Sequence, residues 1–220
     1  SMWVDTDDCT FWYTQEYYPV HSAVRWHTRI GAFKFPSCTL GPRGRLQGTV
    51  RDAATGLPLP GVTVATGANT TQTDSAGDFQ FTALPVGFFD MTVSEYGYVG
   101  QTVTGVLITD VGAQTQDFAL TPLAPATVQG IVTQGSGHTW PLYVRLALSA
   151  PGYSQTVFTD PATGAYTVNL FQGITYTSSV SAVGDGYASA PWVVTPLAGN
   201  VVQNFDLDVD LAACVAPGHQ

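Results

Sequence analysis

Charged residues are scarce in this sequence, and basic residues are scarcer still. Only 10% of the 220 residues are charged, against roughly 25% in typical soluble domains. The formal net charge is −9, six of the seven basic residues lie in the first 51 positions, and Arg145 is the only one after them. Nucleic acids and anionic membrane surfaces are bound through clusters of Lys and Arg. The sequence therefore excludes a nucleic-acid-binding protein and predicts no attraction to an anionic membrane.

Long apolar runs and catalytic signatures are missing as well. No apolar stretch reaches the ~20 residues that a membrane-spanning helix needs, so we expect no membrane insertion. The sequence contains neither a Gly-x-Ser-x-Gly nucleophile elbow nor an HExxH zinc motif. Ser136 and His138 lie in one predicted loop, and this arrangement lacks the orienting acid of a catalytic relay. We therefore predict that the chain is not an enzyme and has no cofactor apart from the calcium ion considered below.

The residues that are present favour β-strands. Hydrophobic residues make up 45% of the chain, and Thr and Val suit the half-buried surface of a strand better than Lys and Glu do. From Arg45 onward, short alternating segments are separated by turn signals at the roughly 8–12-residue spacing of a sandwich or barrel. No segment has a convincing helical period. The predicted strands of this region include residues 46–51, 61–65, 78–82, 89–93 and 114–120.

The same pattern of strands and turns occurs twice along the chain. Four segments recur in the same order: 46–50 as 128–132, 73–79 as 159–166, 97–98 as 186–187 and 116–120 as 203–207. The offset stays between 82 and 89 residues, which indicates an internal duplication at the scale of a domain. The sequence therefore predicts two consecutive β-sandwich modules.

The N-terminal segment differs from both modules. Positions 3–41 hold nine of the 26 aromatic residues, and residues 9–14 and 26–35 have strand character. We expect Cys9 and Cys38 to form a disulfide that closes a loop of about 30 residues and contributes about 3 kcal/mol in the chain-entropy model. Two buried free thiols are the alternative. The third cysteine, Cys214, is left over and has a partner only if one lies outside this sequence.

These observations give a domain organisation with five parts. The N-terminal segment is too short to form a core of its own, so it packs on the next module or ends a preceding domain. A proline-stiffened linker separates the two modules. The predicted parts are an aromatic-rich segment (1–44), a first sandwich (45–121), a linker (122–126), a second sandwich (127–211) and a C-terminal tail (212–220).

Residues 45–121 resemble the carboxypeptidase regulatory-like domain. Four spaced motifs carry the resemblance: Gly48-Thr49-Val50-Arg51-Asp52, the Pro-Leu-Pro-Gly-Val-Thr-Val step at 58–64, Thr73-Asp74-Ser75-Ala76-Gly77-Asp78-Phe79, and Leu84-Pro85-Val86-Gly87. Residues 127–211 are similar but diverged, with Leu170-Phe171-Gln172-Gly173 in place of the last motif.

The resemblance implies a seven-stranded, transthyretin-like sandwich related in shape to starch-binding modules. It also implies tandem copies within a larger secreted bacterial protein. The predicted fold is therefore all-β, with two consecutive seven-stranded-type β-sandwich modules and an N-terminal aromatic-rich β segment. Family members share a fold more than a function, so the resemblance carries no activity.

Two sets of residues are candidates for ligand binding. Trp140 and Trp192, each beside a proline in a predicted loop, and Tyr98 and Tyr187, each after a turn glycine, could stack on sugar rings. Rim packing or contact with a neighbouring domain is the alternative. The candidates for a calcium ion are Asp206, Asp208 and Asp210, which alternation places on one strand face.

Three functions are compatible with the sequence. The first is an accessory or spacer role in a secreted or cell-surface bacterial protein, with neighbouring domains of the parent protein as partners. The second is a carbohydrate-binding module that uses loop aromatics on a polysaccharide, and the third is protein adhesion. A spacer predicts that Trp140 and Trp192 are buried at the interface between the modules, whereas a sugar-binding module predicts that they form an exposed aromatic platform.

Overall fold

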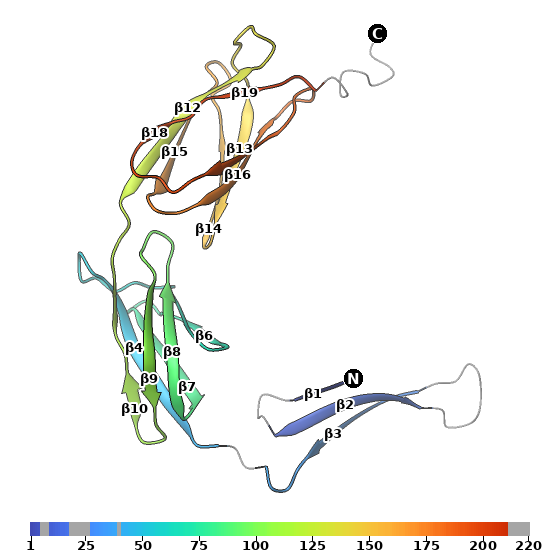
Figure 1. Cartoon of the computed structure of the whole chain (residues 1–220), viewed down its shortest axis with the longest axis vertical. Coiled ribbons are helices and arrows are strands. Elements are labelled where there is room, and N and C mark those ends of the chain that lie inside the picture. The colour runs from blue at the N-terminus through green and yellow to red at the C-terminus, as the bar shows by residue number, and fades with distance from the viewer. Residues whose placement is uncertain (5–8, 18–26, 39–40, 211–220) are drawn as a thin grey trace. The chain divides into compact units, whose positions relative to one another are not determined.

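The computed structural model describes residues 1–4, 9–17, 27–38 and 41–210 (Figure 1). Within these ranges the regular structure consists of β-strands alone, so the all-β prediction is confirmed. The described residues include no helix that is long and apolar enough to cross a membrane. The C-terminal segment with Cys214 lies outside the described residues.

The N-terminal strands form a small antiparallel sheet in the order β1-β2-β3 (Met2–Val4, Thr10–Tyr17 and His27–Lys34). Cross-strand pairing places Phe11 opposite Phe33 on one face, with stacked rings 5.3 Å apart. Trp3 lies opposite Trp12 on the other face, with ring centroids 6.4 Å apart. Both predicted strands of this segment are therefore present, and aromatic pairs on both faces hold the sheet together.

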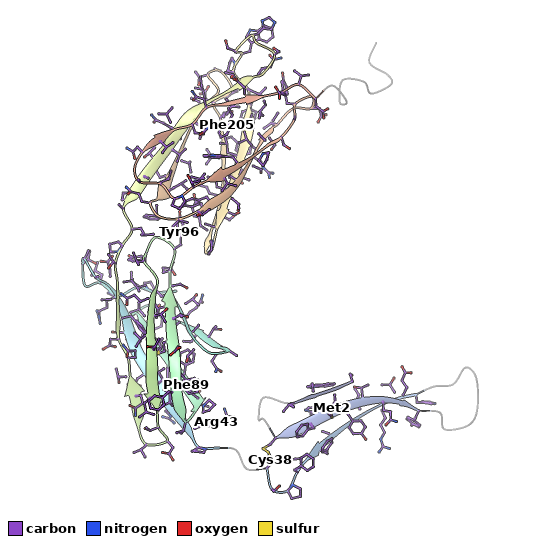
Figure 2. The ribbon with its side chains drawn as sticks, in the orientation of Figure 1. Met2, Cys38, Arg43, Phe89, Tyr96 and Phe205 are labelled. Atoms are coloured by element: carbon purple, nitrogen blue, oxygen red, sulfur yellow. A yellow bond between two sulfur atoms is a disulfide. The ribbon has the colours of Figure 1, made fainter. Side chains whose placement is uncertain are left out.

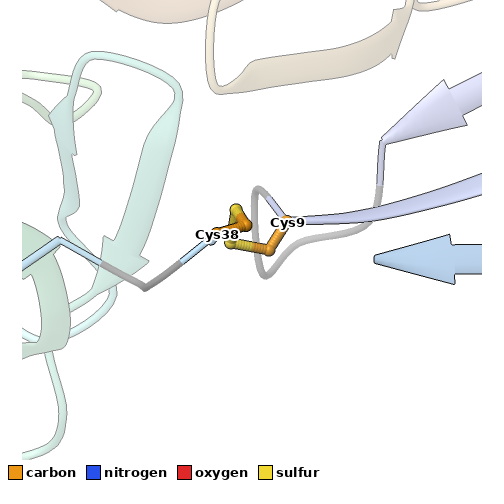
Figure 3. The surroundings of a disulfide bond; sticks show 2 residues. All are labelled: Cys9 and Cys38. Atoms are coloured by element: carbon orange, nitrogen blue, oxygen red, sulfur yellow. A yellow bond between two sulfur atoms is a disulfide. The ribbon is translucent and has the colours of Figure 1, made fainter. Parts of the chain in front are cut away.

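The predicted disulfide joins Cys9, just before β2, to Cys38, just after β3 (Figure 3). The two Cα atoms are 5.7 Å apart, which is within the usual range for a disulfide. Cys9 is buried although most of the sheet around it is exposed. The bond therefore closes the open end of the β2–β3 pair.

The first sandwich consists of two four-stranded sheets. In one, β4 pairs with β7, β10 and β11; the other has the order β6-β5-β8-β9. β10 and β11 lie one after the other along the same side of β4 and are parallel to it, so together they act as one interrupted strand. The strands are β4 (Arg43–Asp52), β5 (Thr63–Thr66), β6 (Asn69–Gln72), β7 (Asp78–Pro85), β8 (Gly87–Ser94), β9 (Gln101–Ile108), β10 (Ala113–Thr115) and β11 (Phe118–Leu120).

The second sandwich has the same pairing scheme. One sheet is built around β12, which pairs with β15, β18 and β19, and the other has the order β14-β13-β16-β17. Its strands are β12 (Pro125–Gln134), β13 (Val144–Ala150), β14 (Tyr153–Phe158), β15 (Ala165–Phe171), β16 (Tyr176–Ala182), β17 (Ala190–Val194), β18 (Val201–Val202) and β19 (Phe205–Leu207). Inward-facing aliphatic residues and two tyrosines, Tyr166 and Tyr176, fill the space between the two sheets.

A buried threonine anchors the same loop in each sandwich. The Thr73 hydroxyl accepts a hydrogen bond from the Val62 amide (2.9 Å) and donates one to the Leu59 carbonyl (2.6 Å). The Thr159 hydroxyl does the same with the Val144 amide (2.9 Å) and the Leu142 carbonyl (2.7 Å). Each hydroxyl therefore satisfies two backbone groups where a strand enters the core.

The turn after each threonine requires a glycine. Gly77 and Gly164 have φ values of +79° and +70°, and their carbonyls accept hydrogen bonds from the Val50 and Val132 amides at 2.8 and 2.9 Å. A Cβ atom at either position would lie within 2.7 Å of the carbonyl oxygen of the same valine. A side chain at either glycine would therefore force the turn away from the strand that carries the valine, which is β4 or β12.

In each sandwich two short strands follow one another beside the central strand, β10 and β11 beside β4, and β18 and β19 beside β12. Between the two short strands, a side chain replaces a backbone group as the hydrogen-bond acceptor. In the first sandwich, the Asp117 carboxylate accepts hydrogen bonds from the Thr49 amide (2.8 Å) and hydroxyl (3.1 Å). In the second, the Asn204 side-chain oxygen accepts one from the Ile131 amide (3.0 Å). An amide of the central strand therefore keeps a partner where the ladder is broken.

The chain divides into two compact units. One comprises residues 1–47, 80–90 and 104–116, and the other comprises residues 48–79, 91–103 and 117–220. This division crosses the first sandwich, so the loop at residues 95–98 belongs to the same unit as the second sandwich. The domain boundaries proposed from the sequence stay predictions.

The buried threonines generate a testable prediction. We expect Thr73→Val to lower the free energy of unfolding by about 2–4 kcal/mol, because it leaves a buried amide and a partly buried carbonyl without their partner. Thr66→Val is a matched control, since Thr66 is 1% exposed and its hydroxyl has no partner among the described residues. This control is expected to be neutral or stabilising. Denaturant unfolding followed by circular dichroism measures both, and equal effects would contradict the prediction.

A second prediction concerns the stability of the chain at low pH. Backbone amide donors, chiefly that of Thr55 for Asp52 and that of Ala162 for Asp160, lower the pKa of both carboxyl groups. A lowered folded-state pKa gives stability that is present above the unfolded value of about 4 and is lost as the pH falls through the folded value. We expect Asp160→Asn to lower the melting temperature at pH 7. Near pH 2.5 the variant and the unmodified chain should have the same melting temperature. Thermal unfolding at both pH values measures the difference, and an Asp160→Asn variant that is equally destabilised near pH 2.5 would contradict the prediction.

Candidate functional site

Trp140 is the only one of the four aromatic sugar-binding candidates with a largely open side chain. It lies in the β12–β13 loop, is 63% exposed and stacks on His138 with ring centroids 5.1 Å apart. The backbone of this loop is fixed, since the Trp140 carbonyl accepts a hydrogen bond from the Gln134 amide (2.9 Å). Trp140 therefore does not show the burial that the spacer hypothesis predicted for it.

Trp192 lies on β17 rather than in a loop. It is half-buried, and its ring meets the Phe205 ring edge to face at 5.1 Å. Its carbonyl accepts a hydrogen bond from the Ser178 hydroxyl (2.5 Å). Trp192 packs against the core of the second sandwich, so its ring offers little open surface to a ligand.

Tyr98 and Tyr187 occupy equivalent positions in the two sandwiches. Each forms an isolated bridge with the chain that follows the closing strand, Tyr98 with Pro122 and Tyr187 with Val209. The Tyr98 hydroxyl donates to the Asp52 carboxylate at 3.0 Å. Burial, and then this hydrogen bond, raise the pKa of Tyr98. Among the ring contacts of the described residues, none joins two of the four candidates.

The three aspartates proposed for calcium lie along the end of the chain that the structure describes. Asp206 on β19 accepts a short hydrogen bond from the Thr133 hydroxyl, and the Asp208 carbonyl accepts one from the Ala188 amide (2.9 Å). Within the described ranges, no three His, Cys, Asp or Glu side chains gather closely enough to hold a metal ion. Calcium binding by Asp206, Asp208 and Asp210 stays a prediction.

An exposed aromatic pair escaped the sequence analysis. Tyr143 and Phe158 stack with ring centroids 5.8 Å apart, and they remain 41% and 48% exposed. Phe158 is the cross-strand partner of Arg145. The signal was present in the alternation from Tyr143 to Leu148, which directs Tyr143 and Arg145 outward while Val144 and Leu146 face the core. The candidates predicted from the sequence were instead aromatic residues beside a proline or after a glycine.

A second aromatic cluster surrounds Tyr96, in the loop after β8 (Figure 2). Its ring stacks on Tyr153 at 4.4 Å and meets Phe171 edge to face at 5.2 Å. Its hydroxyl lies 3.1 Å from that of Tyr176. Burial, and then the hydrogen bond with Tyr176, raise the pKa of Tyr96 far above its ordinary value. The neighbouring Glu95 also has a raised pKa because of burial.

Residues 45–121 match the family model of the carboxypeptidase regulatory-like domain. The match confirms the resemblance that four motifs had indicated for the same residues. A comparison with curated proteins found no match.

Solved structures of pilins are similar in fold. A streptococcal ancillary pilin is 13% identical, with 92% of this chain and 75% of that chain covered and a TM-score of 0.48. The minor pilin of the Gram-positive pathogen Streptococcus agalactiae is 12% identical, with 80% and 98% covered and a TM-score of 0.50. The shaft pilin SpaA of Lactobacillus rhamnosus GG is 14% identical, with 76% and 97% covered and a TM-score of 0.35. The likeness to the minor pilin shows a shared fold and nothing further.

The different exposure of the two tryptophans can be tested by fluorescence. We expect Trp140→Phe to remove a red-shifted component that acrylamide quenches strongly, because the indole faces water. Trp192→Phe should remove a bluer and less quenched component, because its ring packs on Phe205. Stern–Volmer plots of both variants measure the difference. Equal quenching of the two lost components would contradict the arrangement described for β17.

Proposed function

We propose that this chain is a non-catalytic accessory segment of a secreted or cell-surface bacterial protein, and that its sandwiches act as a stiff spacer between neighbouring domains. The observation that carries the proposal is the packing of Tyr96, a loop residue of the first sandwich, against the core of the second. Tyr96 contacts three aromatic rings there. If the connection between the sandwiches were flexible, Tyr96 would not keep fixed partners in the second sandwich.

Hydrogen bonds along the connecting segment support the same role. The Val99 amide donates to the Thr121 carbonyl (2.9 Å), and the Leu123 amide donates to the Gly97 carbonyl (2.8 Å). The Gln172 amide then donates to the Ala124 carbonyl (2.9 Å). The backbone of residues 121–124 is thus held on both sides, and Pro122 restricts it further. A linker of this kind transmits orientation instead of allowing free rotation.

Three further observations support a surface protein built from repeated modules. The Cys9–Cys38 disulfide fits an oxidising compartment outside the cytoplasm. The minor pilin with the same fold is described as coming from a Gram-positive pathogen. The same pairing scheme and the same threonine hydrogen bonds in the two sandwiches are what a duplicated module would have.

The distance between two spin labels tests the spacer role. Labels at Thr92→Cys and Thr167→Cys, both at exposed positions, are introduced in a Cys214→Ser background. We expect pulsed electron paramagnetic resonance to give one narrow distance distribution for this chain. Tyr96→Ala should broaden it, because the variant removes the ring contacts with Tyr153 and Phe171.

Tyr96→Phe is the matched control, since it keeps the ring and removes only the hydroxyl that contacts Tyr176. This variant should keep the narrow distribution. A broad distribution in the chain with native Tyr96 would refute the stiff spacer and favour a flexible tether.

A further inference from the structure

The outer face of the sheet β14-β13-β16-β17 has an ordered arrangement of side chains. Directly paired residues of neighbouring strands point to the same side of a sheet. Phe158, Arg145 and Ser181 therefore form one row across β14, β13 and β16. The next row contains Thr156, Ala147, Ser179 and Pro191, and the third contains Ser154, Ser149, Thr177 and Val193. Neighbouring strands lie about 4.8 Å apart and successive rows about 7 Å apart.

Aromatic surface lies at one end of this face. Phe158 belongs to the first row and Tyr143 stacks on it, and both rings keep a large part of their surface open. Ring faces of this kind suit the C–H face of a sugar. At the opposite corner Val193 is 59% exposed.

The only positive charge of the second sandwich lies beside the aromatic pair. Arg145 is the sole basic residue after position 51, it is exposed, and within the described ranges no carboxylate forms an ion pair with it. A guanidinium group donates in a planar fork that matches a carboxylate in two parallel hydrogen bonds. It is therefore available to a ligand.

Small hydroxyl side chains cover the rest of the face. The hydroxyls of Thr156, Ser179 and Ser181 make no hydrogen bond to other described residues, so they are open to water or to a ligand. The face is hollowed over the second and third rows, where a depression of about 240 Å³ is lined by Ala147, Leu148, Ser149, Ser154, Thr177, Ser178 and Ser179. An extended polar chain can lie here without meeting a large side chain.

We propose that this face binds an acidic polysaccharide. A sugar ring would stack on the Tyr143–Phe158 pair, its carboxylate would bind the Arg145 guanidinium, and the chain would continue along the hydroxyl rows. The guanidinium next to the ring surface has no ion pair within the described ranges, so it favours a sugar that carries a carboxylate at this point. This function goes beyond the spacer role and does not depend on it.

A pair of related polymers tests the proposal with the full 220-residue chain. Polygalacturonate carries a carboxylate on each sugar, and its methyl-esterified form has the same backbone without the charge. We expect affinity electrophoresis and titration calorimetry to show binding to polygalacturonate and on the order of tenfold weaker binding to the ester.

Variants locate the site. Arg145→Gln and Phe158→Ala should each weaken binding on the order of tenfold, whereas Arg51→Gln, which removes one positive charge from the first sandwich, should not. Trp140→Ala should also leave binding unchanged, because Trp140 lies in a separate loop. Melting temperatures close to that of the unmodified chain show that the variants are folded.

Four results would overturn the proposal. They are no binding to polygalacturonate, equal binding to the ester, unchanged binding by Arg145→Gln, and an equal loss with Arg51→Gln. The spin-label distances are measured without polymer, so a negative result here leaves the test of the spacer role intact.

Discussion

Backbone pairing of one central strand organises each sandwich. β4 and β12 each form hydrogen bonds with strands on both sides, antiparallel on one side of β12 and parallel on the other. Both carry fully buried residues, so their amides and carbonyls need protein partners. The turn glycines Gly77 and Gly164, and the side-chain acceptors Asp117 and Asn204, all serve this requirement. The features that recur between the two sandwiches are those that keep the central strand fully bonded.

Much of this architecture could be predicted because it depends on local chemistry. Alternation predicts which residues of β4 and β7 face inward, and the positive φ of the turn at 74–77 favours glycine. The closing strand was predicted as continuous from 114 to 120, whereas the structure interrupts it between β10 and β11. The reason is non-local: the interruption depends on a side chain of the closing strand bonding to the central strand. β9, with small and polar residues such as Gly105 and Thr104, gave no clear strand signal.

The candidate site was harder to predict for a physical reason. Tryptophans in predicted loops are candidates for ligand binding, but the exposure of their side chains depends on packing partners that are distant along the chain. Trp192 is covered because Phe205 packs on it from another strand, while Tyr143 and Phe158 stay open because most outward positions of the next rows carry small side chains. Arg145 shows the same limit. Composition singled it out as a lone cation, but only the register placed it beside an aromatic ring.

The Cys9–Cys38 bond has a mechanical consequence for a protein held at a surface. Tension applied on either side of this loop passes through the two sulfur atoms, because the covalent path between the cysteines is far shorter than the 29 residues of sequence separation. Those residues would otherwise extend by about 100 Å. β2 and β3 therefore carry no load when the chain is stretched, and the Phe11–Phe33 pair between them keeps its geometry. β1 lies before Cys9, outside the closed loop, so only the β2–β3 pair is shielded from tension.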